Sequence, residues 1–425
     1  MTKADIVIIG AGPGGMQASI DLARHDIDVI LIDKSLGKPE APDGCVTIAR
    51  KSYILGNGHC GTPSGIPDWS KEAECDIYTV TMASRNVKSA LESEEVLGYN
   101  FTREKFWNLM LDAAMNLGAT AIETEVIKGE VRNDGVTLET SDGSIEAKAV
   151  IYAGGVRSNP ELPRSLGLGV PPTVHGLFGI FDYDAEWNEP YINILWNQDI
   201  APQGYFWCGV MPKSKKISIG IMNETPVKEA WIYQYLQSKV LPILKEIAPE
   251  KLELQRGELG AVSHLSSNHW PVKHARSRVL GIGEGIGAIS CYVYSGIFES
   301  RYQGQIAAQV LRGIKMDGAW DNAARYQQFE SEWQPLNHNI LRDTRKNHNA
   351  SYHHGSNSVL ITNGYCKALK QKNSAAVESL LGSYLYFESM ASKYELALFN
   401  AIQSNIPLMN KIPVTANLLQ AKMQK

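Results

Sequence analysis

Glycines close to the amino terminus have the spacing of a turn that binds a pyrophosphate. The segment GAGPGG contains Gly10, Gly12, Gly14 and Gly15. In such a turn the first glycine allows a tight bend, Gly12 lets a phosphate approach the backbone, and Gly15 lets the following helix pack closely. The amino terminus of that helix attracts the negative charge of the phosphates. The spacing therefore predicts a dinucleotide site.

An acidic residue follows this turn at the distance expected for a ribose contact. Asp33 lies about 20 residues after the first glycine, where a carboxylate can accept hydrogen bonds from ribose hydroxyls, and Lys34 is the next residue. A second glycine cluster, RVLGIGEGIGA, contains Gly283 and Glu284. It could form a separate NAD(P) site, but no further strand, helix and acid follow it. We therefore assign it to the same cofactor.

The hydrophobic pattern predicts the elements that must position these residues. ADIVIIG is typical of a strand buried on both faces, GMQASIDLARHD of a helix, and DVILID of a second strand. Arg103 stands at the start of an amphipathic helix in YNFTREKFWNLMLDAAMNLGA, and the segments after it are predicted to be strands that return to the first sheet. This order is that of a Rossmann-like domain.

Length and charge restrict the function classes. A chain of 425 residues is longer than most single domains, which predicts two or three lobes. The formal net charge of −4 comes from interspersed acids and bases, which argues against nucleic-acid binding. Six cysteines without a CxxC pair favour reduced thiols in a cytoplasmic protein. Apolar stretches are too short for a signal segment or a membrane span, so any membrane contact is expected to be peripheral.

The order of these segments resembles the FAD-dependent family of aromatic-ring hydroxylases, geranylgeranyl reductases and flavin halogenases, over residues 1 to about 330. The resemblance implies FAD as the cofactor. It implies that Arg103 reaches the FAD phosphates, that the backbone near Val126 contacts adenine, and that Gly283 and Glu284 hold the ribityl chain. The family usually has aspartate in place of Glu284. Gly296 would begin a helix whose amino terminus points at the pyrimidine edge of the flavin.

The family's middle motif, Ala-Asp-Gly, is replaced here by Ala153, Gly154 and Gly155. The missing carboxylate disfavours handling of NADPH in the manner of the hydroxylases. NAD(P)H or another electron donor, including a donor protein, stays open as the source of electrons, and no separate domain is predicted to bind it.

Residues 173–222 contain short apolar runs separated by turn residues, which predicts adjacent antiparallel strands. One run, PQGYFWCGVMP, resembles the Pro-x-x-Tyr-x-Trp-x-Phe-Pro strand of geranylgeranyl reductases. Pro202, Tyr205, Trp207 and Pro212 match it, with two extra residues before the last proline. Alternation places Tyr205 and Trp207 on one face of the strand. They line a slot for a long apolar substrate above the flavin, or they pack the sheet against a helix. The Trp-x-Trp-x-Ile-Pro strand of flavin halogenases is absent.

Cys45 lies in GKPEAPDGCVT, about where geranylgeranyl reductases have a Lys-Pro-Cys-Gly segment over the flavin. Lys38 and Pro39 match that segment, and an insertion displaces the cysteine. A thiol there could protonate a carbon during alkene reduction, sense redox state, or be an inert loop residue. Cys60 in NGHCG competes for the same role.

From residue 316 onward apolar residues recur at helical spacing. Apolar helix faces near residues 377–410 could contact a membrane surface or a second subunit, or could pack on the core. Four histidines lie in an Asn-rich, loop-like region without carboxylate partners, so no metal site is predicted there. They are His338, His348, His353 and His354.

These expectations define an α/β fold with three parts. Residues 1–172 and 257–315 form a discontinuous, Rossmann-like FAD-binding domain of the glutathione-reductase type. Residues 173–256 form an inserted antiparallel β-sheet that binds substrate, and residues 316–425 form a helical C-terminal region. The leading hypothesis is an FAD-dependent oxidoreductase that reduces carbon–carbon double bonds of an apolar, isoprenoid-like substrate. The alternatives are a flavin-dependent monooxygenase acting on an apolar or aromatic substrate, and a flavin-bearing sensor or partner-binding protein without turnover.

Overall fold

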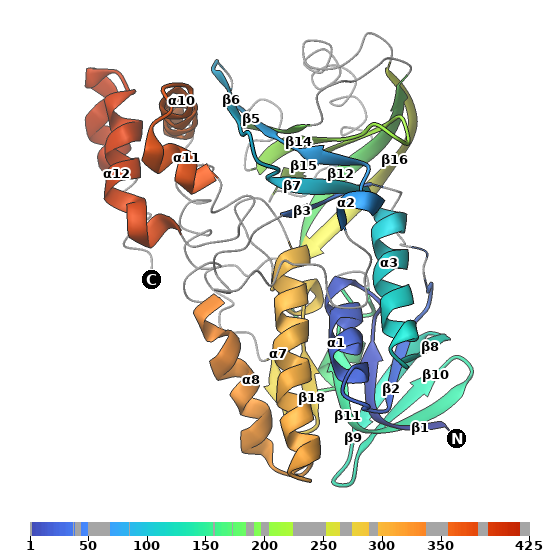
Figure 1. The fold of residues 1–425 in the computed structure, drawn as a ribbon. Coiled ribbons are helices and arrows are strands. Elements are labelled where there is room, and N and C mark those ends of the chain that lie inside the picture. Colours follow the sequence, from blue (N-terminus) through green and yellow to red (C-terminus); the bar gives the residue numbers. More distant parts are fainter. Residues whose placement is uncertain are drawn as a thin grey trace.

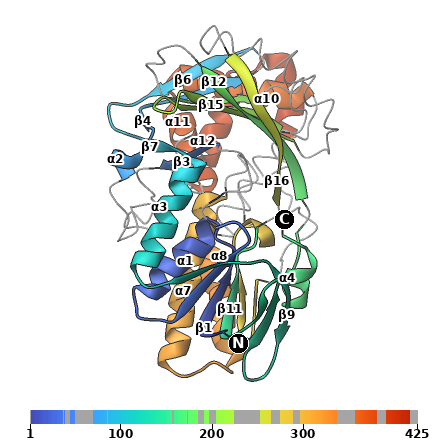
Figure 2. The same ribbon diagram turned by 90° about the vertical axis from the view of Figure 1, so that its right-hand side faces the viewer.

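The computed structural model describes the chain at residues 2–36, 38, 44–49, 69–84, 86–155, 158–171, 173–183, 191–196, 204–223, 252–263, 274–288, 296–336, 356–380 and 390–416. Figure 1 shows a lower part built on a parallel sheet and an upper part built on a second sheet, with a group of helices beside the upper sheet. Figure 2 shows the same two parts after a quarter turn, with strands β3 and β7 between them.

The lower part is built on parallel strands in the order β18-β11-β1-β2-β8. Their bounds are β1 Thr2–Ile9, β2 Val29–Asp33, β8 Thr120–Glu123, β11 Gly143–Tyr152 and β18 Val279–Gly281. Ile6, Val7 and Ile8 of β1 are fully buried, as expected for a parallel strand covered on both faces. Because the strands are parallel, their carboxyl ends meet at one edge of the sheet.

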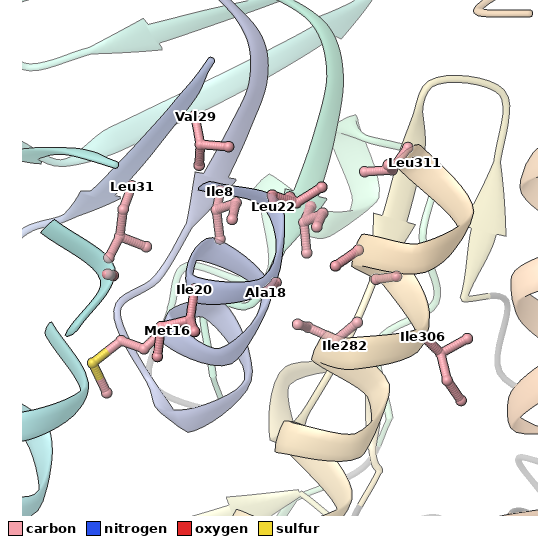
Figure 3. Packing of buried hydrophobic residues seen from close by; sticks show 14 of the residues in the cluster. Ile8, Met16, Ala18, Ile20, Leu22, Val29, Leu31, Ile282, Ile306 and Leu311 are labelled. Atoms are coloured by element: carbon pink, nitrogen blue, oxygen red, sulfur yellow. The ribbon is translucent and has the colours of Figure 1, made fainter. Parts of the chain in front are cut away.

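Helices cover one face of this sheet, namely α1 (Pro13–Ala23), α3 (Arg103–Asn116) and α7 (Ile297–Met316). Two glycines let α1 and α7 approach closely. A Cβ on Gly14 would lie 2.8 Å from the carbonyl oxygen of Ser300, and a Cβ on Gly304 would overlap the carbonyl oxygen of Gly14. Figure 3 shows apolar side chains of the cluster that joins the strands and these helices, among them Ile8, Met16, Ile20, Leu31 and Leu311.

The opposite face of the parallel sheet is covered by β9 (Val126–Val131), β10 (Val136–Thr140) and α4 (Glu161–Ser165). Buried leucines from these elements, Leu138 and Leu162, belong to one apolar cluster with Val7 of β1. The central strands are therefore enclosed on both sides, which explains their continuous apolar sequence.

The upper sheet has the order β16-β12-β15-β14-β13-β5-β6. Its strands are β5 Thr79–Ser84, β6 Lys88–Glu92, β12 Thr173–Tyr183, β13 Tyr191–Trp196, β14 Gly204–Met211, β15 Lys216–Asn223 and β16 Leu252–Ser263. Neighbouring strands are antiparallel except for the parallel pair of β13 and β5. The predicted domain division differs from this arrangement at two places. Strands β5 and β6 come from the segment assigned to the cofactor domain, and the boundary at 256/257 falls inside β16.

A small sheet joins the two parts, with the order β3-β7-β4. Its strands are β3 (Cys45–Ala49), β4 (Cys75–Ile77) and β7 (Gly98–Thr102), and the short helix α2 (Trp69–Glu72) precedes β4. Asn100 is fully buried, and its Nδ2 donates a hydrogen bond of 3.1 Å to the carbonyl oxygen of Val210 in β14. This contact fixes the upper sheet to the segment that leads into α3.

The C-terminal helices lie in two places. α8 (Ala323–Leu336) packs on α7, whereas α10 (Ser356–Lys370), α11 (Ser374–Leu380) and α12 (Met390–Ser404) lie beside the upper sheet. Ser84 of β5 donates a hydrogen bond of 2.5 Å to Oδ1 of Asn363 in α10. None of the helices in the described ranges is long and apolar enough to cross a membrane. The predicted fold class, an α/β core with an antiparallel sheet and C-terminal helices, is confirmed.

Candidate cofactor and substrate site

The glycine turns meet at the carboxyl edge of the parallel sheet. Gly10 follows β1, Ala153 follows β11, and Gly283 follows β18. Gly10 has a φ of +104°, and a Cβ on it would overlap the carbonyl oxygen of Ala153. Only glycine satisfies both constraints. This edge of an open α/β sheet is where ligands bind in such folds.

Gly12 leaves an open space at the amino terminus of α1. It is the N-cap of the helix, makes no side-chain cap, and a Cβ on it would meet no heavy atom within 4 Å. By contrast, a Cβ on Gly15 would overlap the carbonyl oxygen of Gly10, so Gly15 serves the packing of helix on strand. Gly14 contacts α7 as described above. The open position with uncapped backbone donors suits an anionic pyrophosphate.

Asp33 connects the end of β2 to the glycine turn. Its Oδ2 accepts a hydrogen bond of 2.6 Å from the backbone N–H of Ala11, and its Oδ1 accepts one of 2.9 Å from the N–H of Ser35. A carboxylate oxygen has two acceptor sites, so the half-buried side chain keeps acceptor capacity for ribose hydroxyls. Lys34 is exposed in the turn that follows.

The two predicted contacts from other segments lie near this edge. Arg103 is the first residue of α3, which packs against α1, and its guanidinium carbon is 6.0 Å from the ring centroid of Trp107. Val126 begins β9 close to the end of β8. The backbone N–H of Thr124, just before it, donates a hydrogen bond of 3.0 Å to the carbonyl oxygen of Asp33. Phosphate contact by Arg103 and adenine contact near Val126 stay predictions.

The second glycine turn is supported by a glutamine that the sequence did not single out. Gly283, with a φ of +77°, precedes the helical turn Glu284–Ile286, and its N–H donates a hydrogen bond of 2.7 Å to Oε1 of Gln303 in α7. Gln303 is fully buried, and its Nε2 has no hydrogen-bond partner among the described residues. An unsatisfied buried donor fits a site whose ligand supplies an acceptor. Glu284 is half-buried beside it.

A buried histidine supports the same turn from the other side. Nε2 of His274 is 3.3 Å from the carbonyl oxygen of Ile286, and its Nδ1 is 3.4 Å from Oε2 of Glu330 in α8. Burial opposes ionisation of Glu330, but hydrogen bonds and charge from His274 outweigh it and lower the pKa of this carboxyl. The sequence reasoning missed both residues, because no local pattern joins positions on separate elements.

Gly296 is the N-cap of α7 and makes no side-chain cap, so this helix also presents uncapped backbone donors. The first turn of α7 lies against both glycine turns: the Ser300 carbonyl faces Gly14, and a Cβ on Gly283 would lie 3.0 Å from the Ser300 hydroxyl oxygen. The helix amino terminus therefore lies at the same edge of the sheet as the other predicted cofactor residues. Its contact with the flavin stays a prediction.

The two aromatic residues of β14 pack on one apolar cluster but differ in burial. The rings of Tyr205 and Trp207 are 6.0 Å apart between centroids. Tyr205 is 5% exposed in a cluster with apolar residues of α10, α11 and α12, and burial raises the pKa of its phenol. Trp207 is half-buried and lies so close to Gly220 of β15 that a Cβ there would overlap the indole ring. Tyr205 thus packs the sheet against helices. Trp207 packs at the margin of the same cluster, and its contact with a substrate stays a prediction.

Cys45 of β3 lies against the same strand, β14. A Cβ on Gly209, two residues after Trp207, would lie 2.8 Å from both Cβ and Sγ of Cys45. Just before the cysteine, the carbonyl oxygen of Gly44 accepts a hydrogen bond of 2.7 Å from the N–H of Arg103. Cys45 therefore lies between the predicted phosphate contact and the aromatic strand. Within the described residues, Cys45, Cys75 and Cys366 form no disulfide.

Other residues named from the sequence lie outside the described residues. They are Pro39, Cys60, Pro202, His338, His348, His353 and His354. Within the described ranges, no group of three or more His, Cys, Asp or Glu side chains is arranged to hold a metal ion.

Comparison with known sequences finds reductases among the relatives of this chain. No model of a known protein family matches the chain. Over 338 residues it is 26% identical to digeranylgeranylglycerophospholipid reductase 2 of Methanosphaera stadtmanae, a match that covers 73% of this chain and 79% of that protein. A digeranylgeranylglycerophospholipid reductase of Methanocaldococcus jannaschii is 23% identical over 362 residues, 79% of this chain and 84% of that protein.

Solved structures share the fold over nearly the whole chain. A geranylgeranyl bacteriochlorophyll reductase-like protein from Thermoplasma acidophilum has a TM-score of 0.71 at 18% identity and covers 94% of this chain and 100% of its own. The flavin-dependent brominase Bmp2 has a TM-score of 0.65 at 14% identity, over 95% of this chain and 99% of its own. The resemblance predicted from the sequence is confirmed: in sequence and in fold, this chain is similar to the geranylgeranyl reductase-like flavoproteins.

Proposed function

We propose that this protein is an FAD-dependent oxidoreductase that reduces carbon–carbon double bonds of an apolar, isoprenoid-like substrate. The observation that carries the proposal is the position of Cys45. It touches Gly209 on the aromatic strand, and its neighbour Gly44 is hydrogen-bonded to the start of α3 at Arg103. The thiol thus lies against the aromatic strand, and a hydrogen bond joins its neighbour to the residue predicted to contact the FAD phosphates. The similarity to digeranylgeranylglycerophospholipid reductases supports the same chemistry.

The residues present fit FAD. The pyrophosphate would lie at the open Gly12 position, the adenosine ribose at Asp33, and the ribityl chain at the Gly283 turn, where Gln303 has a free amide donor. When bound in its reduced form, FAD supplies the hydride for the double bond. We propose that residues 1–172 and 257–315 form the domain that holds FAD. Strands β5 and β6 fall within these ranges but belong to the upper sheet.

The chain's own residues would perform the other tasks. Trp207 would contact the apolar substrate from β14, and the Cys45 thiol would donate the proton that saturates the second carbon. Hydride plus proton would convert the alkene to the alkane, leaving oxidised FAD and a Cys45 thiolate. The thiol lies against a glycine, where no side chain separates it from the strand. Water can reprotonate the thiolate after each turnover.

The electron donor and the cellular setting belong to the same proposal. NAD(P)H or a donor protein would reduce the flavin without a dedicated binding domain, as the Ala153-Gly154-Gly155 segment suggests. Peripheral contact with a membrane would give the protein access to a lipid substrate.

The experiment combines cofactor analysis with a single anaerobic turnover. Protein loaded with FAD and reduced by dithionite is mixed with a digeranylgeranylglycerol lipid, and products are identified by mass spectrometry. We expect addition of dihydrogen to double bonds, and a much slower reaction for Cys45→Ser at unchanged FAD content. The proposal fails if the reduced protein leaves the lipid unchanged without oxygen. Incorporation of an oxygen atom in air would instead identify a monooxygenase.

A further inference from the structure

An exposed apolar segment follows helix α12. Leu408, Met409 and Ile412 are 81%, 93% and 82% exposed, and Pro407 and Pro413 at the ends of this segment are exposed as well. We call residues 407–413 the C-terminal tip. Among the described residues, the other exposed large apolar side chains are scattered singly: Tyr78, Met115, Ile127 and Met316. Scattered apolar residues are ordinary on a protein surface, but a fully exposed group within one turn of chain indicates a contact surface.

The tip is held in place from both ends. Ile406 and Val414, which flank it, are 4% and 0% exposed and belong to the apolar cluster that contains Tyr205. Leu408–Asn410 forms a short helical turn, with the N–H of Asn410 hydrogen-bonded to the carbonyl oxygen of Pro407 at 2.9 Å. The exposed side chains are therefore presented by a segment that is anchored on both sides in the cluster containing Tyr205.

Lysines lie within the tip and at the end of α10, which is hydrogen-bonded to the end of α12. Lys411 lies within the tip, and the end of α10 carries the exposed lysines Lys367, Lys370 and Lys372. Reciprocal hydrogen bonds of 3.0 and 3.2 Å between the side chains of Gln371 and Asn405 join the end of α10 to the end of α12. The described stretches 356–380 and 390–416 contain five lysines and two glutamates. Their net charge is +3, whereas the net charge of the whole chain is −4. The basic excess is thus local to this region.

We propose that the C-terminal tip docks on the surface of an anionic phospholipid bilayer. Apolar side chains flanked by lysines match such a surface, because the former enter the boundary between headgroups and acyl chains while the latter contact lipid phosphates. A second copy of the chain fits less well. A symmetric contact through this tip would bring two lysine groups together, and lysine is depleted in protein interfaces. That the docked protein draws its substrate from the bilayer rests on the proposed function, whereas the docking itself does not.

The test is cosedimentation of the full-length, FAD-loaded protein with vesicles. Vesicles of phosphatidylcholine with phosphatidylglycerol are compared with vesicles of phosphatidylcholine alone, at low and at high salt. We expect the wild type to bind the anionic vesicles and to be released by salt. The combined variant Lys367→Gln, Lys370→Gln, Lys372→Gln should lower the partition coefficient on the order of 100-fold, given the contribution of each lysine near an anionic surface.

The apolar half of the tip is tested by the combined variant Leu408→Ser, Met409→Ser, Ile412→Ser. We expect it to lose vesicle binding while its melting temperature and FAD content match the wild type, because these side chains are exposed. Met316→Ser, which alters a single side chain that is 78% exposed at the end of α7, is the matched control and should bind as the wild type does. Retained binding by the serine variant, or loss of binding by Met316→Ser, overturns the proposal.

Two further measurements separate the possible failures. Light scattering of the lipid-free protein tests the second copy: a dimer that the serine variant converts to monomer, without vesicle binding by the wild type, overturns the lipid proposal. Turnover of detergent-dispersed lipid tests the reductase activity alone. Vesicle binding without turnover would leave the docking surface supported and the proposed function refuted.

Discussion

Replacing Gly12 with valine is expected to remove FAD binding while the apoprotein stays folded. Gly12 has φ −77° and ψ 177°, a conformation open to any residue, and a Cβ on it meets nothing within 4 Å. The change at the helix N-cap costs roughly 1 kcal/mol or less. A valine side chain would occupy the space through which a pyrophosphate reaches the backbone donors of α1. Loss of two hydrogen bonds to a charged group, at about 1.5–3 kcal/mol each, raises the Kd for FAD at least ~100-fold.

Gly15→Ala is the matched control within the same turn. A Cβ on Gly15 would overlap the carbonyl oxygen of Gly10. This oxygen belongs to the backbone and cannot rotate away from the new methyl group. Such overpacking costs about 1–3 kcal/mol or more. The substitution at Gly12 is therefore expected to impair cofactor binding, and the substitution at Gly15 is expected to impair folding.

Thermal unfolding with and without FAD, together with a flavin fluorescence titration, distinguishes these effects. FAD at about 100 times its Kd should stabilise the wild type by about 2.7 kcal/mol and should leave Gly12→Val unchanged. The apoprotein of Gly15→Ala should melt earlier than that of Gly12→Val. The reasoning is refuted if Gly12→Val binds FAD with wild-type affinity, or if its apoprotein is as unstable as Gly15→Ala.

Arg103→Ala is expected to weaken FAD binding by about 1.5–3 kcal/mol, and an unchanged Kd in the same titration would exclude a phosphate contact. Tyr205→Ala should lower the unfolding free energy in urea by about 3–5 kcal/mol. Because Trp207 is only half-buried, Trp207→Ala should lower it less, and it should slow the reduction of a long alkene more than that of a short analogue. Equal turnover of both alkenes would make this tryptophan structural. The folded-state pKa of Glu330 is lowered beside His274, so its contribution to stability is complete above its unfolded pKa of about 4.3 and is lost as pH falls through the lower folded value. Glu330→Gln should remove this part of the pH dependence of the unfolding free energy, measured by urea unfolding at acid pH. An unchanged pH dependence would show that the Glu330–His274 pair does not contribute to stability.

The sequence by itself determined the features that depend on neighbours along the chain. The glycine turn, the strand before it and the helix after it form one continuous unit, so their spacing predicts their geometry, including the open position at Gly12. The alternation in β14 likewise determined that Tyr205 and Trp207 share a face. These features follow from the fixed periods of helix and strand, which any short segment reveals.

Only the tertiary structure decided which distant segments meet. Strand β5 pairs in parallel with β13, which places residues 79–92 in the upper sheet. No local sequence pattern specifies which strand pairs with a given strand. The same holds for Gln303 at Gly283, for His274 with Glu330, and for Cys45 against Gly209. It also decided that Tyr205 faces helices, because a side chain's environment depends on which element covers its face. Periodicity states which residues point the same way, whereas chain packing, driven by burial of the whole apolar surface, decides what they point at.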